Sequence, residues 1–251
     1  MAESTLTRDY DDVEVAVARF LNLPAIGDAA RTAAQTTRID EHIQSGYMRF
    51  LYPEDGYQWS FMSPTDSFST VADDYDYDLP DNFLSMKGDM TVSDDGSWWP
   101  ISERAEETIR DFRSQGQTTG RPVYYAVRAV TFVETTGQRY EMLLWPTPDQ
   151  VYTIERKFNV LPDKAVTSTA PHFLGGMPHS RTIREACLAE AEAAEHDTQG
   201  LHEARFRQLL RASISVDTRL KPITLGFDAA QEPPSKWNRT IINTVNGSVP
   251  P

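Results

Sequence analysis

The 251-residue sequence has a single cysteine, Cys187, so it cannot form an internal disulfide. One thiol in a chain of this length fits assembly in a reducing cytoplasm. No apolar run approaches the roughly 18 residues that span a bilayer, and the mean hydropathy is −0.49. The acidic first residues lack the basic and apolar regions of a signal peptide. These absences predict a protein that neither spans a membrane nor is secreted.

Basic residues are also scarce, with 24 Lys and Arg against 37 Asp and Glu, which gives a formal net charge of −13. Each phosphate that a protein neutralises releases counterions and strengthens DNA binding, so a DNA-coating protein needs the opposite balance. The composition therefore excludes tight DNA wrapping and a basic membrane-surface protein. Since domains mostly hold about 100–200 residues, the length predicts one large domain or two small ones.

The sequence lacks the common catalytic and cofactor motifs. It contains no glycine-rich phosphate loop, no dinucleotide fingerprint and no Gly-x-Ser-x-Gly nucleophile motif. His202-Glu203 begins a zinc-protease motif, but Phe206 stands where the second histidine ligand should be. We therefore expect no catalytic residue, no cofactor and no metal. A paired-acid hydrolase stays open because carboxylates are abundant, although their spacing selects no pair.

Cys187 and two of the histidines have structural interpretations. Cys187 lies on an alanine-rich helical face without an adjacent base, which favours a buried small side chain over a nucleophile. His172 and His179 flank a glycine-containing loop and lack a partner at metal-ligand spacing. We interpret both as turn residues.

Acidic residues concentrate between Pro53 and Pro100. This stretch holds eleven acidic residues against Lys87 alone, together with nine aromatic residues. A disordered acidic tail usually contains fewer aromatics. We therefore expect the segment to be folded, at least in part.

Within this segment, Asp74, Asp76 and Asp78 alternate as acidic residues do at the start of a calcium-binding loop. Leu79 and Ser85, however, stand where such a loop requires glycine and glutamate. A solvated acidic loop is therefore the preferred interpretation.

Two amphipathic helices are predicted before the acidic segment. The first has an apolar stripe over residues 13–20, and Asp11 or Asp12 can cap its start. The second is capped by Asp28, carries an apolar stripe and ends before Pro53. Two adjacent stripes predict a helical hairpin.

The middle of the chain changes to a β-type pattern. Ser102 predicts the capped start of a short helix that reaches about Arg113. After it, residues 123–133 and 139–145 predict an antiparallel hairpin, and residues 151–160 predict a third strand.

Residues 180–216 return to helical periodicity, with two apolar faces separated by a break at residues 196–200. From residue 220 onward the chain loses periodicity and predicts an arm. Its apolar residues are costly to leave in water, so docking against a partner and simple terminal disorder both stay open.

Together these patterns predict an α+β fold. A helical bundle formed by the N- and C-terminal helices carries an inserted antiparallel β-rich body and an extended C-terminal arm. The expected division is residues 1–52 for the N-terminal helices, 53–165 for the acidic aromatic segment and β-rich insertion, 166–219 for the C-terminal helices, and 220–251 for the arm.

A resemblance to a known family is carried by six short segments: Leu79 to Phe83, Gly120 to Ala126, Leu144 to Asp149, Tyr152 to Pro162, Ala189 to Glu192 and Phe206 to Leu210. In this order, between residues 75 and 217, they resemble the head-to-tail adaptor proteins of tailed bacteriophages. These are neck or connector proteins that dock beneath the portal.

The resemblance implies a helical bundle with a β-rich insertion, a ring of twelve copies, no enzymatic activity and no cofactor. Its implied partners are further copies of the chain, the portal protein and a downstream tail or nozzle protein. DNA would pass through without specific binding, and no membrane would be involved. The implied location is the virion neck, after synthesis in the host cytoplasm.

Two sets of residues are candidate interaction sites for such a role. An acidic surface or channel lining would let DNA slide because it does not bind phosphates; its candidates are Asp73, Asp74, Asp76 and Asp78. The arm could dock on the portal by strand addition or in a groove; its candidates are Trp237, Ile241, Ile242 and Val245.

Two functions of other classes stay open. A glycan- or receptor-binding virion protein would explain the aromatic and acidic residues between 53 and 100. A cytoplasmic regulatory module is the second alternative, and it would be favoured by a protein that stays monomeric when mixed with a portal.

Overall fold

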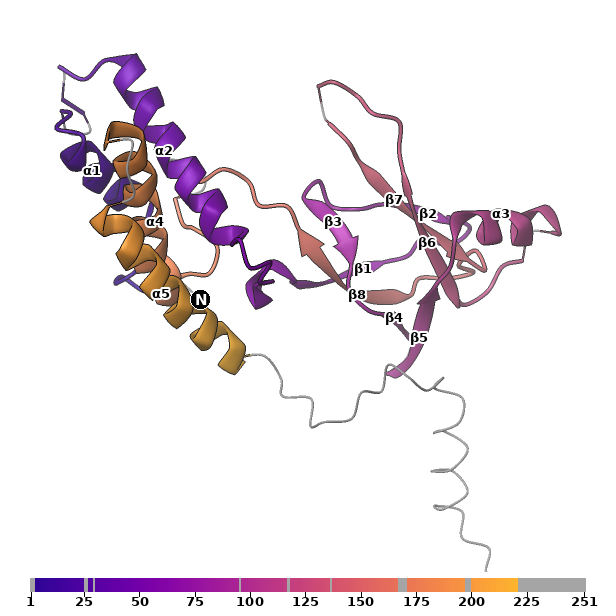
Figure 1. Cartoon of the computed structure of the whole chain (residues 1–251). Helices are drawn as coiled ribbons and strands as arrows, with labels where there is room; N and C mark the ends of the chain where they lie inside the picture. Colours follow the sequence, from indigo (N-terminus) through magenta and orange to yellow (C-terminus); the bar gives the residue numbers. More distant parts are fainter. Residues whose placement is uncertain are drawn as a thin grey trace, which may run out of the picture.

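The computed structural model describes residues 3–24, 27–28, 30–94, 96–116, 118–135, 137–166, 171–196 and 200–220. In these ranges a helical bundle adjoins a curled β-sheet (Figure 1). The predicted α+β class is confirmed. The arm and its candidates Trp237, Ile241, Ile242 and Val245 lie outside the described residues.

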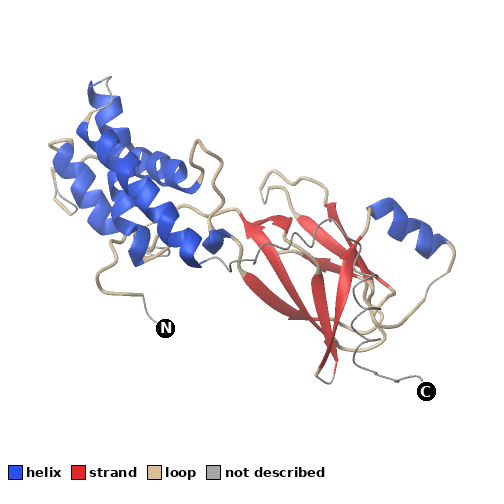
Figure 2. Cartoon of the chain, turned by 60° about the horizontal axis from the view of Figure 1, so that its bottom comes forward, coloured by secondary structure: helices blue, strands red, loops and turns tan. Residues whose placement is uncertain are grey.

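The bundle consists of α1 (Tyr10–Phe20), α2 (Ala33–Leu51), α4 (Met177–His196) and α5 (Leu201–Leu220). Helix α4 packs against each of the other three, and Figure 2 shows the four helices gathered on one side of the sheet. The predicted joining of N- and C-terminal helices in one bundle is confirmed. No helix in the described ranges is long and apolar enough to cross a membrane.

Helix α1 begins after Asp9, whose carboxylate accepts a hydrogen bond from the backbone N–H of Asp12 at 3.0 Å. The predicted caps Asp11 and Asp12 are wrong, because both lie inside the first turn. They still stabilise the helix there, since negative charge near a helix N-terminus interacts favourably with its dipole.

Helix α2 begins after Thr32, not at the predicted cap Asp28. The Thr32 side chain accepts from the N–H of Gln35, and the Gln35 side chain accepts from the N–H of Thr32. This reciprocal arrangement satisfies two backbone donors that a single aspartate cap would not. The Asp28 carboxylate accepts from the N–H of Ala30 in the preceding turn instead.

The sheet has the strand order β1-β8-β4-β5-β6-β7-β2, with β3 also paired to β8. Its strands are β1 (Thr65–Ser69), β2 (Asp76–Asp78), β3 (Phe83–Met86), β4 (Met90–Asp94), β5 (Ser97–Glu103), β6 (Tyr124–Ala129), β7 (Tyr140–Trp145) and β8 (Thr153–Val160). Strands β1 to β5 fall in or begin in the acidic aromatic segment. The expectation that this segment folds is therefore confirmed.

The sheet is mixed, whereas antiparallel strands were predicted. Strands β5 and β6 run parallel, with Ser102 opposite Tyr124 and Glu103 opposite Tyr125. Parallel neighbours need a crossover connection, and α3 (Glu106–Ser114) supplies it. The predicted cap Ser102 and its neighbour Glu103 belong to β5, because they pair in the sheet before α3 begins.

The predicted hairpin exists as β6 and β7, paired antiparallel over six residues of each strand. The first strand was predicted to continue to Val133, but it ends at Ala129. Phe132 and Val133 lie in the connecting loop and are 61% and 49% exposed.

The two ends of the strand order approach each other through side chains. The rings of Phe68 on β1 and Tyr77 on β2 have centroids 5.3 Å apart. The Tyr77 hydroxyl accepts from the N–H of Val71 at 3.1 Å and donates to the carbonyl of Asp74 at 2.9 Å. The sheet therefore curls until its edges nearly meet.

The core runs without interruption from the bundle into the sheet. Residues 53–63, which include the short helix η1 (Ser60–Met62), join the two parts. Trp59 in this segment is 1% exposed, and its indole N–H donates to the carbonyl of Phe50 at 3.0 Å. The rings of Trp59 and Phe50 lie 4.6 Å apart. We call residues 53–63 the joint.

Candidate functional site

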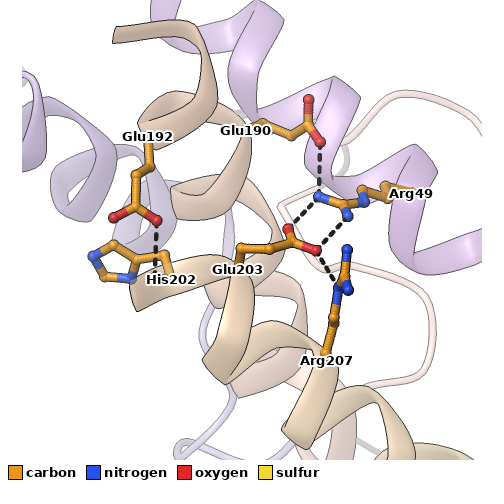
Figure 3. A network of polar contacts seen from close by, with 6 residues as sticks. All are labelled: Arg49, Glu190, Glu192, His202, Glu203 and Arg207. Carbon is orange, nitrogen blue, oxygen red and sulfur yellow. Dashed lines mark hydrogen bonds and ion pairs between the residues drawn. The ribbon is translucent and has the colours of Figure 1, made fainter. Parts of the chain in front are cut away.

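A polar network ties α2, α4 and α5 together (Figure 3). Arg49 on α2 donates to both carboxylate oxygens of Glu203 on α5, at 2.7 and 2.8 Å, and to Glu190 on α4 at 3.2 Å. Arg207, one turn beyond Glu203, donates to the same carboxylate at 2.6 Å. Two arginines therefore share the carboxylate of Glu203. One lies on the same helix, and the other, Arg49 on α2, is more than 150 residues away in the sequence.

Glu203 is only 5% exposed, so its charge depends on these partners. Burial alone would raise its pKa, but the hydrogen bonds from Arg49 and Arg207 hold the pKa below its usual value. The same contact with Glu203 raises the pKa of Arg49. The network therefore stays ionised and holds α2 against α5.

The turn between α4 and α5 is also held by a carboxylate. Glu192 accepts from the backbone N–H groups of Leu201 and His202 at 3.1 and 2.9 Å. These are first-turn donors of α5, which have no partner inside their own helix. The His202 ring lies 2.8 Å from Glu185. His202 and Glu203 are thus parts of a helix face, as predicted, and Phe206 is buried in the core.

The last turn of α5 is fastened to the joint through Asp217, which is fully buried. Its carboxylate accepts from the hydroxyl of Tyr57 at 2.7 Å and from the backbone N–H of Ser60 at 3.1 Å. The Ser60 hydroxyl donates to the same carboxylate. Asp217 therefore fixes where the described chain ends relative to the sheet.

His179 lies in the first turn of α4 and is 2% exposed, so its interpretation as a turn residue is wrong. Its ring packs against the rings of Phe50, Trp59 and Phe61 at centroid distances of 5.9, 5.2 and 5.5 Å. These aromatic neighbours bury the ring and lower its pKa. Its Nδ1 atom has no hydrogen-bond partner within the described ranges. His172, in contrast, is exposed in the loop.

We expect this buried histidine to make stability depend on pH. The unfolded chain binds a proton at His179 near the ordinary pKa of 6.5, whereas the folded chain binds it only at lower pH. Stability should therefore fall as the pH drops from about 7 to about 5, and His179→Gln should remove part of that fall. Urea unfolding at several pH values measures this pH dependence of stability. The control is His172→Gln, at an exposed histidine. Equal pH slopes for the two variants would contradict the prediction.

The four acidic candidates lie at one edge of the sheet. Asp73 and Asp74 belong to the turn before β2, and Asp76 and Asp78 belong to β2 itself. Asp73 and Asp78 are exposed, whereas Asp74 and Asp76 are half-buried. Arg128 lies 3.9 Å from Asp76 and offsets part of its charge. Their exposure to a channel stays a prediction.

Cys187 is fully buried against α2, and its thiol donates weakly to the carbonyl of Ile43 at 3.5 Å. Burial raises the pKa of the thiol, so the reactive thiolate is disfavoured. The prediction of a buried small side chain is confirmed. Within the described ranges, no group of three or more His, Cys, Asp or Glu side chains is placed to hold a metal ion, and this includes the aspartates of β2.

The arrangement offers surfaces and buried networks that hold elements together. The family model described as SU10 adaptor protein matches residues 8–225. The chain belongs to this family. It is a phage adaptor, a structural protein of the virion. The match also covers the N-terminal helices, which lie before the part of the chain that carried the resemblance in sequence. No curated protein matches the chain.

The sequence alone did not single out Arg49 and Asp217, and it assigned His179 to a turn instead of the core. Glu203 and Arg207 stand four residues apart, a spacing that indicates an ion pair on one helix face. That spacing is the one local signal of the network. The partners of Arg49, His179 and Asp217 come from distant segments, so no local pattern could identify these residues.

Proposed function

We propose that this adaptor protein forms a ring, of twelve copies, that docks beneath the portal in the virion neck and surrounds part of the DNA exit channel. The observation that carries the proposal is the family match over residues 8–225. Further partners would be a downstream tail or nozzle protein. The portal contact, the number of copies and the channel are all parts of the proposal.

The charge of the chain supports passage of DNA without binding. With a net charge of −13, the protein offers few cations to phosphates. Exposed acidic residues such as Asp73 and Asp78 would repel a passing duplex. In the proposed ring we place the edge formed by β2 and its preceding turn toward the channel.

We propose no catalytic activity and no cofactor. Glu203 and His179 have shifted pKa values, but each is used in packing or in an ion-pair network between elements. Perturbed groups of this kind are also common in purely structural networks. Adaptor function therefore needs no chemistry from these residues.

The proposal is tested by mixing the full chain with the portal protein of the same phage and imaging the mixture by electron microscopy. We expect rings of the adaptor attached to portal rings. A chain that stays monomeric beside intact portal rings would contradict the proposal and favour a regulatory module. Binding of glycans by a chain that ignores the portal would favour a receptor-binding protein.

For the arm, we propose that its apolar residues bind the portal. Deleting residues 233–251 should abolish co-assembly with the portal and leave the melting temperature nearly unchanged. Each buried apolar side chain contributes about 1.5–3 kcal/mol, and a ring multiplies that contribution through avidity. Co-sedimentation and thermal unfolding measure the two effects. As a matched control, Asn238→Ala with Asn246→Ala should co-assemble normally. Normal co-assembly of the truncated chain would contradict this role of the arm.

A further inference from the structure

Two cavities open side by side where the C-terminal end of α2 faces the sheet. One, of about 320 Å³, runs along α2 to residues 161–164. The other, of about 240 Å³, lies over the joint and reaches Leu84 on β3 and Val160 on β8. Leu51 and Tyr52 line both. We call the two cavities together the joint groove.

The joint groove is bordered by large apolar side chains that remain exposed. Met48 is 64% exposed, Tyr52 48%, Leu84 45% and Leu161 44%. Single exposed apolar residues are ordinary, but four of them around one groove form a contiguous patch that indicates a binding surface. An extended apolar segment fits such a groove.

The chain leaves its described part beside this groove. Helix α5 ends at Leu220, and its last turn is fastened to Tyr57 through Asp217 and Thr218 at 2.7 and 3.1 Å. Tyr57 itself lines the groove. The described part of the C-terminal helix therefore ends next to the groove.

The sequence that follows Leu220 alternates large apolar residues with other residues, a pattern that places its apolar side chains on one face of an extended segment. Ile223, Leu225 and Phe227 alternate with Thr224 and Gly226. In an extended conformation, alternate side chains point to the same face, so the three apolar side chains share one face. The seven residues that follow Leu220, from Lys221 to Phe227, span at most about 25 Å. The family match also continues past α5, to residue 225.

We propose that residues 221–228 lie in the joint groove of their own chain, with Ile223, Leu225 and Phe227 packed against its apolar wall. The short connection to α5 favours the same chain, because it gives the segment a high effective concentration at its own groove. The inference goes beyond the adaptor role and does not depend on it. It leaves the arm from residue 233 onward available for another partner.

The occupant is tested by crosslinking the full chain. We expect Leu84→Cys combined with Leu225→Cys to be joined by a short bismaleimide reagent within one chain, with the linked peptides identified by mass spectrometry. Cys187 does not compete because it is fully buried. The control pairs Leu225→Cys with Val133→Cys, which is exposed in the loop between β6 and β7. Linkage between two chains would overturn the same-chain occupant, and linkage no stronger than the control would overturn the site.

A stability measurement tests the same inference without crosslinking. The triple variant Ile223→Asp, Leu225→Asp and Phe227→Asp should lower the melting temperature by about 5 °C or more, because three apolar side chains would leave the groove. The matched triple variant Ile241→Asp, Ile242→Asp and Val245→Asp should change it by no more than about 1 °C. Equal shifts for the two variants would overturn the proposal.

Discussion

Replacing Gly46 by alanine is expected to destabilise the fold by about 3 kcal/mol. The same substitution inside an exposed helix usually stabilises by about 1 kcal/mol, because alanine is the better helix former. At Gly46 the sign reverses, since a Cβ atom there would lie 2.5 Å from both the Cα and the backbone nitrogen of Cys187. Backbone atoms of α4 cannot move aside as a flexible side chain would. Helices α2 and α4 would have to separate.

Urea unfolding of Gly46→Ala measures this effect. The control is Ser45→Ala on the adjacent, exposed position of α2, where alanine should stabilise by a few tenths of a kcal/mol. The midpoint of unfolding should fall for Gly46→Ala and rise slightly for Ser45→Ala. If Gly46→Ala were as stable as the wild-type chain, the close approach of the two helices would be contradicted.

The periodicity of α2 was predictable because it reflects local geometry. Its predicted stripe consists of Thr36, Ile39, Ile43, Tyr47 and Phe50. The last four are buried in the core, whereas Thr36 is exposed in the first turn of the helix. A stripe of this kind is dictated by the 3.6-residue repeat alone. Gly46 shows the limit of such reasoning, because its need for glycine comes from α4, more than 130 residues away in the sequence.

Helix starts and strand pairing were less predictable, for different reasons. Several polar residues near each helix start can serve as the cap, and the choice of Thr32 over Asp28 depends on the partner Gln35. The parallel pairing of β5 with β6 depends on where α3 crosses the sheet. Neither the choice of cap nor the direction of strand pairing alters the pattern of apolar residues, so that pattern could not predict them.

Among the candidate site residues, exposure was predictable from the sequence, whereas burial against distant segments was not. Exposure of Asp73 and Asp78 agrees with an acidic surface, since charged residues in turns and at sheet edges face water. Burial of His179 and Asp217 could not be foreseen, because the joint that covers them is itself an irregular segment. The joint is therefore the part of this fold that sequence patterns describe least.

Replacing Arg49 by methionine is the second large effect, with an expected loss of about 3 kcal/mol. Methionine keeps much of the side-chain length but removes the guanidinium that holds Glu203 and Glu190. Glu203 would remain buried, at 5% exposed, and Arg207 would still donate a hydrogen bond to its carboxylate. Leaving a buried charge without one of its partners lowers folding stability far more than an exposed ion pair raises it.

The matched control is Arg38→Met, which also removes a cation of α2 that pairs with α4. Arg38 and its partner Glu195 are exposed at 49% and 32% of their side-chain surface, so we expect a loss of no more than about 1 kcal/mol. Similar losses for Arg38→Met and Arg49→Met, measured by urea unfolding, would contradict the importance of the buried network.

The pH dependence of the Arg49→Met effect identifies its cause. In the wild-type chain the pKa of Glu203 lies below its usual value of 4.5, so its stabilisation is present above that value and is lost as the pH falls through the lower folded pKa. In Arg49→Met the carboxylate loses its main partner, and its pKa should rise. The two proteins should therefore converge in stability as the pH is lowered from about 7 toward about 4, because protonation removes the unpaired charge.

The double variant Arg49→Met with Glu203→Gln should recover part of the loss at pH 7, since no buried charge is left without its partner. A difference that stays constant with pH, together with no recovery in the double variant, would mean that Arg49 acts through packing and not through its charge.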